Sequence, residues 1–410
     1  MRLNRYKPLN YGGLSIYILT VNCGSSSLKF ALYNVNGVES PSVSGSFEKI
    51  AQSIGSFHVK SASGNTLDKS DLRISDHESA MEKLFHWLET NHYPAKKLDA
   101  VGHRFVHGGL KLTKPTIVTP EVLQTLKGPI PPAPDHLPQE IKAIEAVCKR
   151  YPKLKQIVCF DTAFHHDMPR LGKIYPLPRY LLEQGIIRYG FHGLSYEFIM
   201  EELKSIDGSA VAKGRIIVAH LGSGASMAAV KNGRSLDTTM GFTPTGGLMM
   251  STRSGDLDPG VILYLLGEKK LSSEAVSDLL NKKAGLLGVS DLSSDMEELL
   301  AKKDSKNAGE AIELFCYQAR KFLGALSAVL GGVDTLVFTA GIGENAPVIR
   351  ELICRGMEYL DIDLDARLNL KGAPVISSES SSVTVRVIKT NEELMIARHT
   401  CKLINKIKEE

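Results

Sequence analysis

Charged side chains stand between glycines, at the end of an apolar run, or in a polar loop in four short motifs. These motifs are GHRFVHGG (102–109) with Arg104 and His107, FDTAFHH (160–166) with Asp161, YGFHG (189–193) with His192, and STRSGDLDPG (251–260) with Arg253. For each residue alone, a buried ion pair or a hydrogen-bonded core histidine is the commoner explanation. Together, two arginines, a histidine and an aspartate are what phosphoryl transfer between anions requires, because cations must spread the negative charge of the transferring group.

Two turns of small residues offer backbone N–H groups to an anion. LTVNCGSSSLKF (19–30) and HLGSGAS (220–226) each lie between two apolar strands. Consecutive Gly and Ser residues leave the N–H groups unshielded, and such groups in a concavity bind phosphate, with Lys29 as a further positive charge. Aligning Asn22 with His220, an offset of 198 residues, places Gly24 on Gly222. Either the resemblance of two Gly/Ser turns is chance, or the chain contains two related α/β domains.

A third small-residue motif, GIGEN (341–345), follows a predicted strand at 334–339 and precedes a predicted helix near 346–359. With Ala346 and Asp361 it fits a loose dinucleotide pattern, although little chain remains to complete a nucleotide-binding sheet. Backbone that approaches a ligand at the start of a helix serves an adenosine nucleotide equally well. No GxxxxGK[ST] motif is present, so the sequence has no Walker-type phosphate loop.

The elements that position these motifs follow an α/β pattern. Alternating or apolar runs predict successive strands within 15–60, then strands at 98–103, 156–160, within 215–234, and at 383–388. Helical spacing predicts helices at 76–92, after the stretch 128–138 with its five prolines, and at 259–268, 272–283 and 307–330. A final helix is expected to begin after Thr390, with Thr390 as its N-cap and Glu393 at the capping-box position.

Length and composition exclude several classes of protein. The 410 residues predict two domains, and a net charge of +4 is too small for a nucleic-acid-binding surface. Six cysteines without CxxC spacing indicate free thiols in a reducing cytoplasm. No apolar run approaches the roughly 20 residues of a membrane-spanning helix. The basic and then apolar N-terminus imitates a signal peptide, but Asn22 is a poor residue before a cleavage site.

Eight motifs follow one another along the chain: NCGSSSLK, GHRFVHGG, FDTAFH, RYGFHGLS, HLGSGAS, TRSGDLDPG, GIGEN and TNEE. In this order they resemble the motifs of the acetate kinase family, from about residue 16 to 400. The resemblance implies a duplicated actin-like ATPase (sugar kinase/Hsp70) fold of the α/β class, with two domains around a cleft. We expect an N-terminal extension at 1–14, one domain at 15–163 plus 395–410, and a nucleotide-side domain at 164–394. The resemblance also implies a cytoplasmic homodimer that contacts neither nucleic acid nor membrane.

The implied activity is reversible, ATP-dependent phosphorylation of acetate by direct in-line transfer, which gives acetyl phosphate and ADP, with Mg²⁺ or Mn²⁺ as the metal. Propionate or butyrate is the alternative acid. Pyrophosphate is an alternative donor, but the glycines of GIGEN leave room for adenosine. A non-catalytic nucleotide sensor on the same fold is disfavoured, because every charged residue that the chemistry needs is present.

The resemblance assigns roles to individual residues. Asn22 and Glu392 match positions that hold the metal, although the helix dipole favours an acid in a first turn in any case. The implied catalytic residues are Arg104, which binds the substrate carboxylate, Asp161, an essential acid, and His192 with Arg253, which stabilise the transferring phosphoryl group. Val106, Phe191 and Pro244 match the pocket for the alkyl group of the acid. The implied nucleotide-binding residues are Ser25, Ser27, Lys29, His220, Leu221, Gly222, Ser223, Gly224, Asp295, Met296, Glu297, Gly341, Ile342, Gly343, Glu344 and Asn345.

Four residues depart from the family's usual pattern. Ser223 replaces an Asn and Glu297 an Arg, which bears on nucleotide affinity, while Tyr196 replaces a His. Asp135 replaces an apolar pocket residue. It either turns outward or pairs with a cation, since a buried carboxylate is unfavourable unless paired. Neither arrangement enlarges an apolar space, so the sequence predicts acetate as the best substrate, propionate as the second, and butyrate as a poor one.

Overall fold

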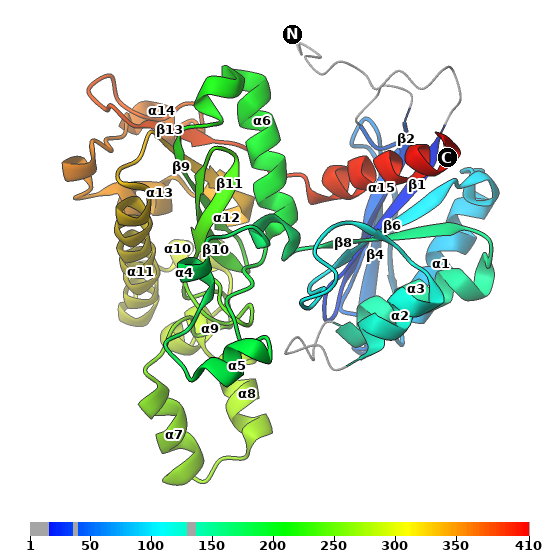
Figure 1. Cartoon of the computed structure of the whole chain (residues 1–410), viewed down its shortest axis with the longest axis horizontal. Helices are drawn as coiled ribbons and strands as arrows, with labels where there is room; N and C mark the ends of the chain where they lie inside the picture. The colour runs from blue at the N-terminus through cyan, green and yellow to red at the C-terminus, as the bar shows by residue number, and fades with distance from the viewer. Residues whose placement is uncertain (1–15, 36–39, 129–136, 410) are drawn as a thin grey trace. The chain divides into compact units, whose positions relative to one another are not determined.

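The computed structural model describes residues 16–35, 40–128 and 137–409, and the chain folds into two compact units (Figure 1). The first unit consists of the described residues up to Ala163 together with those from Asn391 onward. The second unit is Phe164–Thr390. The predicted N-terminal extension and Asp135 lie outside the described residues.

The first unit is built on a mixed sheet. Its strands in the described part of the chain are β1 (Tyr17–Cys23), β2 (Leu28–Asn34), β3 (Val43–Glu48), β4 (Gly55–Ser61), β5 (Thr66–Leu72), β6 (Ala100–Phe105), β7 (Thr116–Ile117) and β8 (Lys155–Phe160). Their order in the sheet is β5-β4-β3-β2-β1-β6-β8-β7. Strands β1, β6 and β8 are parallel, whereas β1 to β5 form an antiparallel meander.

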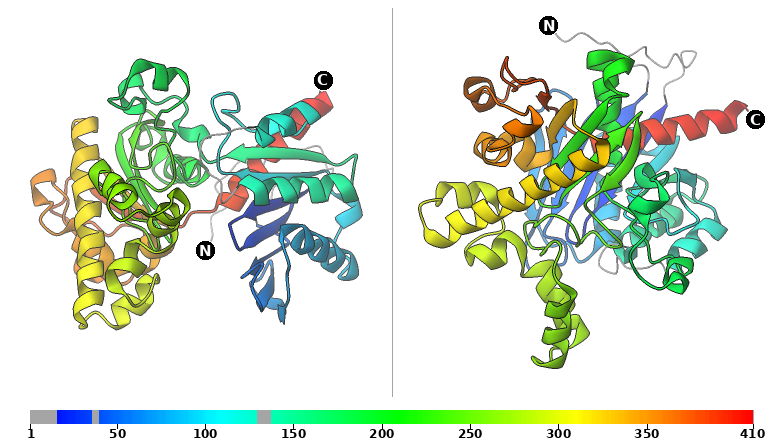
Figure 2. Two further views of the ribbon diagram at one scale, coloured as in Figure 1. Left: turned by 90° about the horizontal axis from the view of Figure 1, so that it is seen from below. Right: turned by 60° about the vertical axis from the view of Figure 1, so that its left-hand side comes forward.

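Helices cover both faces of the parallel part of this sheet. Helices α1 (His77–Thr90) and α3 (Leu137–Arg150) pack on one face, over a core that contains Phe30, Phe47 and Phe57. The short α2 (Pro120–Lys127) lies against α3. The C-terminal α15 (Glu392–Glu409) packs on the other face of β1 and β6, as Figure 2 shows. Gly102 of β6 permits this approach, because a β-carbon there would lie 2.6 Å from the Ile396 side chain of α15.

The second unit repeats the core of this topology. Its strands are β9 (Arg215–Leu221), β10 (Ala225–Lys231), β11 (Arg234–Thr238), β12 (Thr335–Thr339) and β13 (Thr384–Val387), in the order β11-β10-β9-β12-β13. β9 pairs antiparallel with β10 and parallel with β12, as β1 pairs antiparallel with β2 and parallel with β6. The orders β3-β2-β1-β6-β8 and β11-β10-β9-β12-β13 therefore correspond, and the starts of β1 and β9 lie at the offset of the sequence repeat.

The helices of the second unit flank this smaller sheet. They are α4 (Arg170–Lys173), α5 (Arg179–Glu183), α6 (Gly193–Val211), α7 (Pro259–Gly267), α8 (Ser273–Lys282), α9 (Gly285–Ser290), α10 (Met296–Ala301), α11 (Lys306–Leu330), α12 (Ala340–Asn345), α13 (Pro347–Cys354) and α14 (Ala366–Leu370). The long α11 packs against β9, β10 and β11, and α6 contacts β9 (Figure 2). In no described segment is there a helix with the length and apolar character needed to cross a membrane.

Two local predictions near helix starts were wrong, although the expected helices themselves begin where predicted, α13 at Pro347 and α15 at Glu392. GIGEN is not a loop before the expected helix but belongs to a short helix of its own, α12, in which the Glu344 carboxylate accepts the N–H of Ala340 at 2.8 Å. The C-terminal helix is capped by Asn391, whose side chain accepts the N–H of Leu394 at 3.0 Å, and not by Thr390. The Thr390 hydroxyl instead contacts the Ser195 hydroxyl at 2.8 Å.

Candidate active site

In the first unit, three predicted site residues lie at the carboxyl ends of the parallel strands. Asn22 is near the end of β1, Arg104 near the end of β6, and Asp161 directly follows β8. The parallel registers pair Val21 with His103, and Arg104 with Cys159, so the three ends fall at one edge of the sheet. This edge is where open α/β sheets collect their functional residues.

Arg104 joins these residues through its guanidinium group. Nε and Nη2 donate to the two carboxylate oxygens of Asp161 at 3.1 and 2.5 Å, and Nη1 donates to Asn22 Oδ1 at 3.3 Å. The Asp161 side chain is only 1% exposed and that of Arg104 16%, so this bidentate pair is held away from water. Burial alone would lower the pKa of Arg104, but the charges of Asp161, Glu392 and Glu140 outweigh it and raise that pKa above its usual value.

Two further acids surround this pair. Removal from water raises the pKa of Glu392, in the first turn of α15, to about 7; Arg104 opposes the rise and Asp161 adds to it. Glu140, on α3, is buried, and its two carboxylate oxygens each lie 3.2 Å from the backbone nitrogen of Val106. Burial raises the pKa of Glu140 to about 8, although Arg104 and the Val106 N–H lower it.

Sequence reasoning missed Glu140. It lies four residues before Ile144 and seven before Val147, and therefore on the buried stripe of α3. An acid on an apolar stripe is the signal that would have identified it.

The turn after β1 is partly closed on itself. The Gly24 N–H donates to the Ser27 carbonyl at 2.8 Å, and the His77 ring lies 2.9 Å from the Gly24 carbonyl. The Gly24 N–H is thus already bonded within the turn, whereas Ser25 is exposed. The phosphate-binding role predicted for Ser25 and Ser27 remains a prediction.

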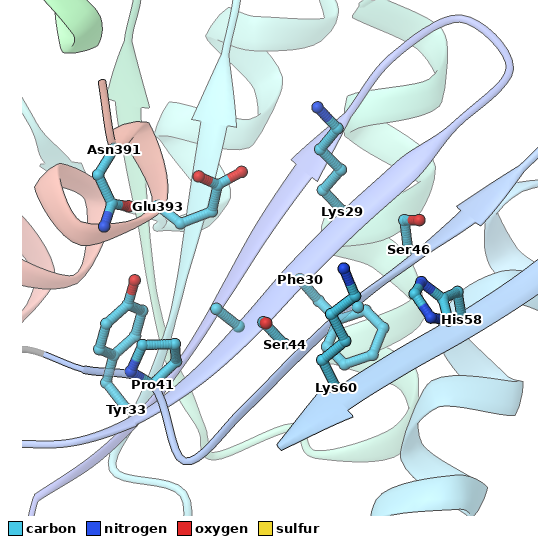
Figure 3. A pocket seen from close by; sticks show the side chains of 12 residues that line it. Lys29, Phe30, Tyr33, Pro41, Ser44, Ser46, His58, Lys60, Asn391 and Glu393 are labelled. Carbon is cyan, nitrogen blue, oxygen red and sulfur yellow. The ribbon is translucent and has the colours of Figure 1, made fainter. Parts of the chain in front are cut away.

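Lys29, on β2 beyond this turn, lies in an open pocket of about 360 Å³ on the exposed face of the sheet (Figure 3). The pocket is also lined by Ser46 of β3, His58 and Lys60 of β4, and Glu393 of α15. In register, Lys29 pairs with Ser46 and Ser46 with His58, so these three residues form one row across three strands, whereas Lys60 pairs with Ser44 in another row.

In the second unit, His192 occupies the residue before α6 with φ of 58° and ψ of 25°, in the left-handed region. Its Nδ1 lies 2.8 Å from the Ser226 hydroxyl of β10, and its ring stacks on that of His220 at 4.2 Å between centroids, with 19° between the planes. His220 Nδ1 in turn contacts the Ser195 hydroxyl at 2.8 Å. Two strand residues and the start of α6 therefore fix the orientation of His192.

Arg253 and His192 come together at Gly224. A β-carbon on Gly224 would lie 3.1 Å from His192 Nε2 and 3.4 Å from Arg253 Nη2, so both groups face the glycine backbone. Arg253 Nη1 donates to the Pro244 carbonyl at 2.7 Å, which orients the guanidinium group. The structure brings these two predicted residues together, and their joint role in catalysis remains a prediction.

The two small-residue loops of the second unit lie side by side. β12 runs parallel to β9, and a β-carbon on Gly222 would lie 3.5 Å from Ala340 Cβ and 3.9 Å from the Gly341 nitrogen. Glu344 accepts the N–H groups of Ala340 at 2.8 Å and Thr390 at 3.1 Å, so its side chain fixes backbone. In this loop pair Leu221 and Gly343 are buried, Gly222, Gly224 and Ile342 are half-buried, and Ser223, Gly341 and Asn345 are exposed.

The remaining predicted residues are dispersed. Asp295 caps α10 by accepting the N–H of Glu297 at 2.7 Å, Met296 is buried, and the Glu297 residue is exposed. Val106 belongs to the first unit, while Phe191 and Pro244 belong to the second. Their common pocket therefore remains a prediction.

These observations define a class of protein. Two sheets of corresponding topology, each with a small-residue hairpin turn beside parallel strands, constitute an actin-like ATPase fold, which acetate and propionate kinase structures share. The sequence profile described as the acetokinase family matches residues 17–398, and the chain belongs to this family. The predicted fold class and family are thereby confirmed.

Similarity to individual relatives extends over nearly the whole chain. The chain is 49% identical over 396 residues to an acetate kinase of Rhodopseudomonas palustris. The aligned region covers 95% of this chain and 99% of that protein. Among solved structures, Porphyromonas gingivalis acetate kinase has a TM-score of 0.85 at 39% identity and covers 95% of this chain and 100% of that chain. A propionate kinase from Francisella tularensis has a TM-score of 0.86 at 37% identity, and the match covers 94% of this chain and 98% of that chain.

We expect Glu140→Gln to flatten the pH dependence of stability of the first unit. The folded-state pKa of about 8 lies above the ordinary 4.5, so the folded unit binds more protons than the unfolded chain between these values. Wild-type stability therefore falls as pH rises from about 4.5 to 8, by on the order of a few kcal/mol, because one pKa unit corresponds to about 1.4 kcal/mol. Urea unfolding followed by the single Trp87, which lies in this unit, measures the effect.

The matched control for this measurement is Glu145→Gln. Glu145 lies on the same helix but 46% of its side chain is exposed, so its replacement should leave the wild-type profile unchanged. Parallel pH profiles of the wild type and Glu140→Gln would contradict the assignment.

Proposed function

We propose that the protein phosphorylates acetate reversibly with ATP and forms acetyl phosphate and ADP. The observation that carries this proposal is the meeting of His192 Nε2 and the Arg253 guanidinium at Gly224, beside the HLGSG and GIGEN loops. Family membership supports it, because the named relatives are acetate and propionate kinases. A sensor without catalysis would not need a histidine and an arginine directed at one point.

In the proposed reaction, a carboxylate oxygen of acetate attacks the γ-phosphorus of ATP in line, and the bond from that phosphorus to the β-phosphate oxygen breaks. Arg253 and His192 donate to the phosphoryl oxygens, where negative charge must be spread in the transition state. We assign Arg104 to the acetate carboxylate. Its Nε and Nη2 donate to Asp161 and its Nη1 donates to Asn22 Oδ1, so the second N–H groups of Nη1 and Nη2 are the donors left for the substrate. Asp161 thereby orients Arg104.

The donor set of the first unit fits a hard cation such as Mg²⁺. Asn22 supplies an amide oxygen and Glu392 a carboxylate, and Mg²⁺ commonly takes one or two such ligands together with phosphate oxygens and water. No group of three or more acidic, histidine or cysteine side chains suited to a metal occurs among the described residues. When bound, the ion would neutralise charge on the phosphate oxygens.

A panel of acids tests the activity and the acid preference. The protein is incubated with ATP, Mg²⁺ and acids of one to five carbons, and the acyl phosphate is trapped with hydroxylamine. We expect acetate to be the best substrate, propionate the second, and butyrate at least about tenfold poorer, because one methylene in an apolar pocket is worth roughly 1–3 kcal/mol. Preference for butyrate, or turnover when pyrophosphate replaces ATP, would refute this assignment. Preference for propionate would identify the propionate kinase alternative, which a similar solved structure represents.

We expect His192→Ala and Arg253→Ala each to reduce kcat by about 10²–10³-fold while the dissociation constant of ATP changes little. Both groups act on charge that develops only in the transition state. Steady-state kinetics and calorimetric titration with ATP measure the two quantities. The exposed His166 and Arg179 of the same unit provide control alanine variants. Equal losses in kcat and in ATP affinity would remove both residues from the catalytic set.

We also infer a homodimer that uses α7. This helix is apolar throughout, and Val261, Leu263 and Tyr264 are 43%, 69% and 50% exposed. A helix that is hydrophobic on all sides is normally covered.

The six free cysteines, none in a disulfide, support a reducing cytoplasmic compartment.

We expect Leu263→Glu to convert the dimer to a monomer in analytical ultracentrifugation, because a carboxylate buried in an apolar interface is unfavourable. Leu171→Glu is the matched control, since Leu171 is 84% exposed in the same unit but lies on α4. A monomeric wild type, or a dimeric Leu263→Glu variant, would contradict the proposed interface.

A further inference from the structure

Behind His192 lies a buried pair of hydroxyl groups. The Ser226 hydroxyl is 2.8 Å from His192 Nδ1 and 2.5 Å from the Tyr196 hydroxyl. Ser226 and Tyr196 are both 0% exposed. Tyr196 lies four residues after His192, at the start of α6, and Ser226 lies on β10, so a helix and a strand hold the three groups in place.

The two hydroxyl groups constrain each other's protons. Ser226 has one proton and two neighbours, so it can donate to only one of them. A phenol is a stronger acid than an aliphatic alcohol, and in the pair Tyr196–Ser226 the phenol is therefore the donor. Burial raises the pKa of Tyr196 above its ordinary value, so the phenol keeps its proton at neutral pH. The proton of Ser226 is then left for His192 Nδ1.

We propose that Tyr196 and Ser226 are positioning residues that keep the proton of a neutral His192 on Nε2, the nitrogen that faces Gly224. A neutral imidazole has one donor and one acceptor nitrogen, and the bond made by one nitrogen decides the role of the other. With Nδ1 accepting from Ser226, Nε2 carries hydrogen and can donate to an acceptor beside Gly224. The catalytic use of this proton rests on the proposed function, whereas its location is a property of the resting protein.

The groups around His192 favour this neutral form. Arg253 lies beside the same glycine, and a neighbouring cation disfavours an imidazolium. The stacked His220 is held by Ser195, and His165, which packs against Tyr196, contacts Ser235 and the Phe191 carbonyl. His192 can thus donate a hydrogen bond without gaining a proton. The rate of phosphoryl transfer should therefore not decline as the pH rises through the ordinary imidazole pKa of about 6.5.

Thr238 is the group that could reverse the direction of the hydrogen bonds from Tyr196 to Ser226 and from Ser226 to His192. It neighbours the phenol, and because its own proton goes to the Met227 carbonyl at 2.9 Å, its oxygen is a second acceptor for Tyr196. If the phenol donated to Thr238, Ser226 would donate to the phenol and accept from Nδ1. The proton of His192 would then reside on Nδ1, which is the opposite tautomer.

Nitrogen-15 spectroscopy of the full-length protein distinguishes the two tautomers without any assay of activity. Long-range ¹H–¹⁵N correlation spectra of histidine-labelled protein at pH 7.5 are assigned to His192 by comparison with His192→Gln. We expect a neutral ring protonated on Nε2 in the wild type, and a mixture or the Nδ1 form in Tyr196→Phe. A wild-type ring protonated on Nδ1, or an unchanged tautomer in Tyr196→Phe, would overturn the proposal.

Kinetics supply the second readout. We expect Tyr196→Phe to lower kcat by at least about tenfold with less than about twofold change in KM for ATP, and to add a decline in kcat above pH 7 that the wild type lacks. Ser226→Ala should behave alike, and Ser226→Thr, which keeps the hydroxyl, should restore kcat. Tyr189→Phe, a buried phenol bonded to the Gly185 carbonyl at 2.9 Å, is the control and should remain at the wild-type kcat.

Normal kcat in Tyr196→Phe and Ser226→Ala would refute the positioning role. A wild-type protein without acetate kinase activity would instead refute the proposed function, while the spectra would still decide the tautomer.

Discussion

Parallel pairing of the inner strands is the constraint on which the arrangement of the candidate site depends. In the first sheet β1, β6 and β8 run in one direction, and in the second sheet β9, β12 and β13 do the same. Because parallel strands end at one edge, the residues that follow them are neighbours however far apart they are in the chain. Asn22, Arg104 and Asp161 meet in this way, although the first and last are 139 residues apart, and so do the HLGSG and GIGEN loops.

The first unit uses this edge to gather charge away from water. The guanidinium group of Arg104 forms an ion pair with Asp161 and interacts with Glu140 and Glu392 through its positive charge. Three ionised acids around one cation in a low-dielectric interior would repel one another. Burial raises the pKa values of Glu140 and Glu392 to about 8 and about 7, and the negative charge of Asp161 adds to both rises, while Asp161 itself is the bidentate partner of the arginine. The edge is therefore sensitive to any additional anion or cation.

Much of the fold followed from the sequence, because the signals were strong and local. The apolar runs around 17–34 and 215–231, with glycine and serine between them, predicted both hairpins and the repeat that relates the two sheets. Motif order predicted the family. Where one side chain competed with another for the same backbone, local signals failed. Asn391 and not Thr390 caps α15, and the GIGEN residues, predicted as a loop, form the separate helix α12, where the Glu344 carboxylate accepts the N–H of Ala340.

Contacts between distant elements could not be predicted from one sequence. Ser226 is an ordinary alternating residue of β10, and only the packing of α6 brings Tyr196 and His192 to it. Glu140 was visible as an acid on a helix, but its bond to the Val106 N–H depends on how α3 lies against β6. These residues act through other residues, and a motif search does not register such roles.

The missing side chain of Gly224 leaves a small space beside His192 and Arg253. A methyl group there would lie 3.1 Å from His192 Nε2 and 3.4 Å from Arg253 Nη2, and the first of these is a distance at which a nitrogen donor also approaches an oxygen. The space that the glycine leaves is therefore about the size of a single acceptor atom, and it lies beside two donors of different rigidity. Any larger residue at this position would occupy that space and exclude an acceptor atom from both donors.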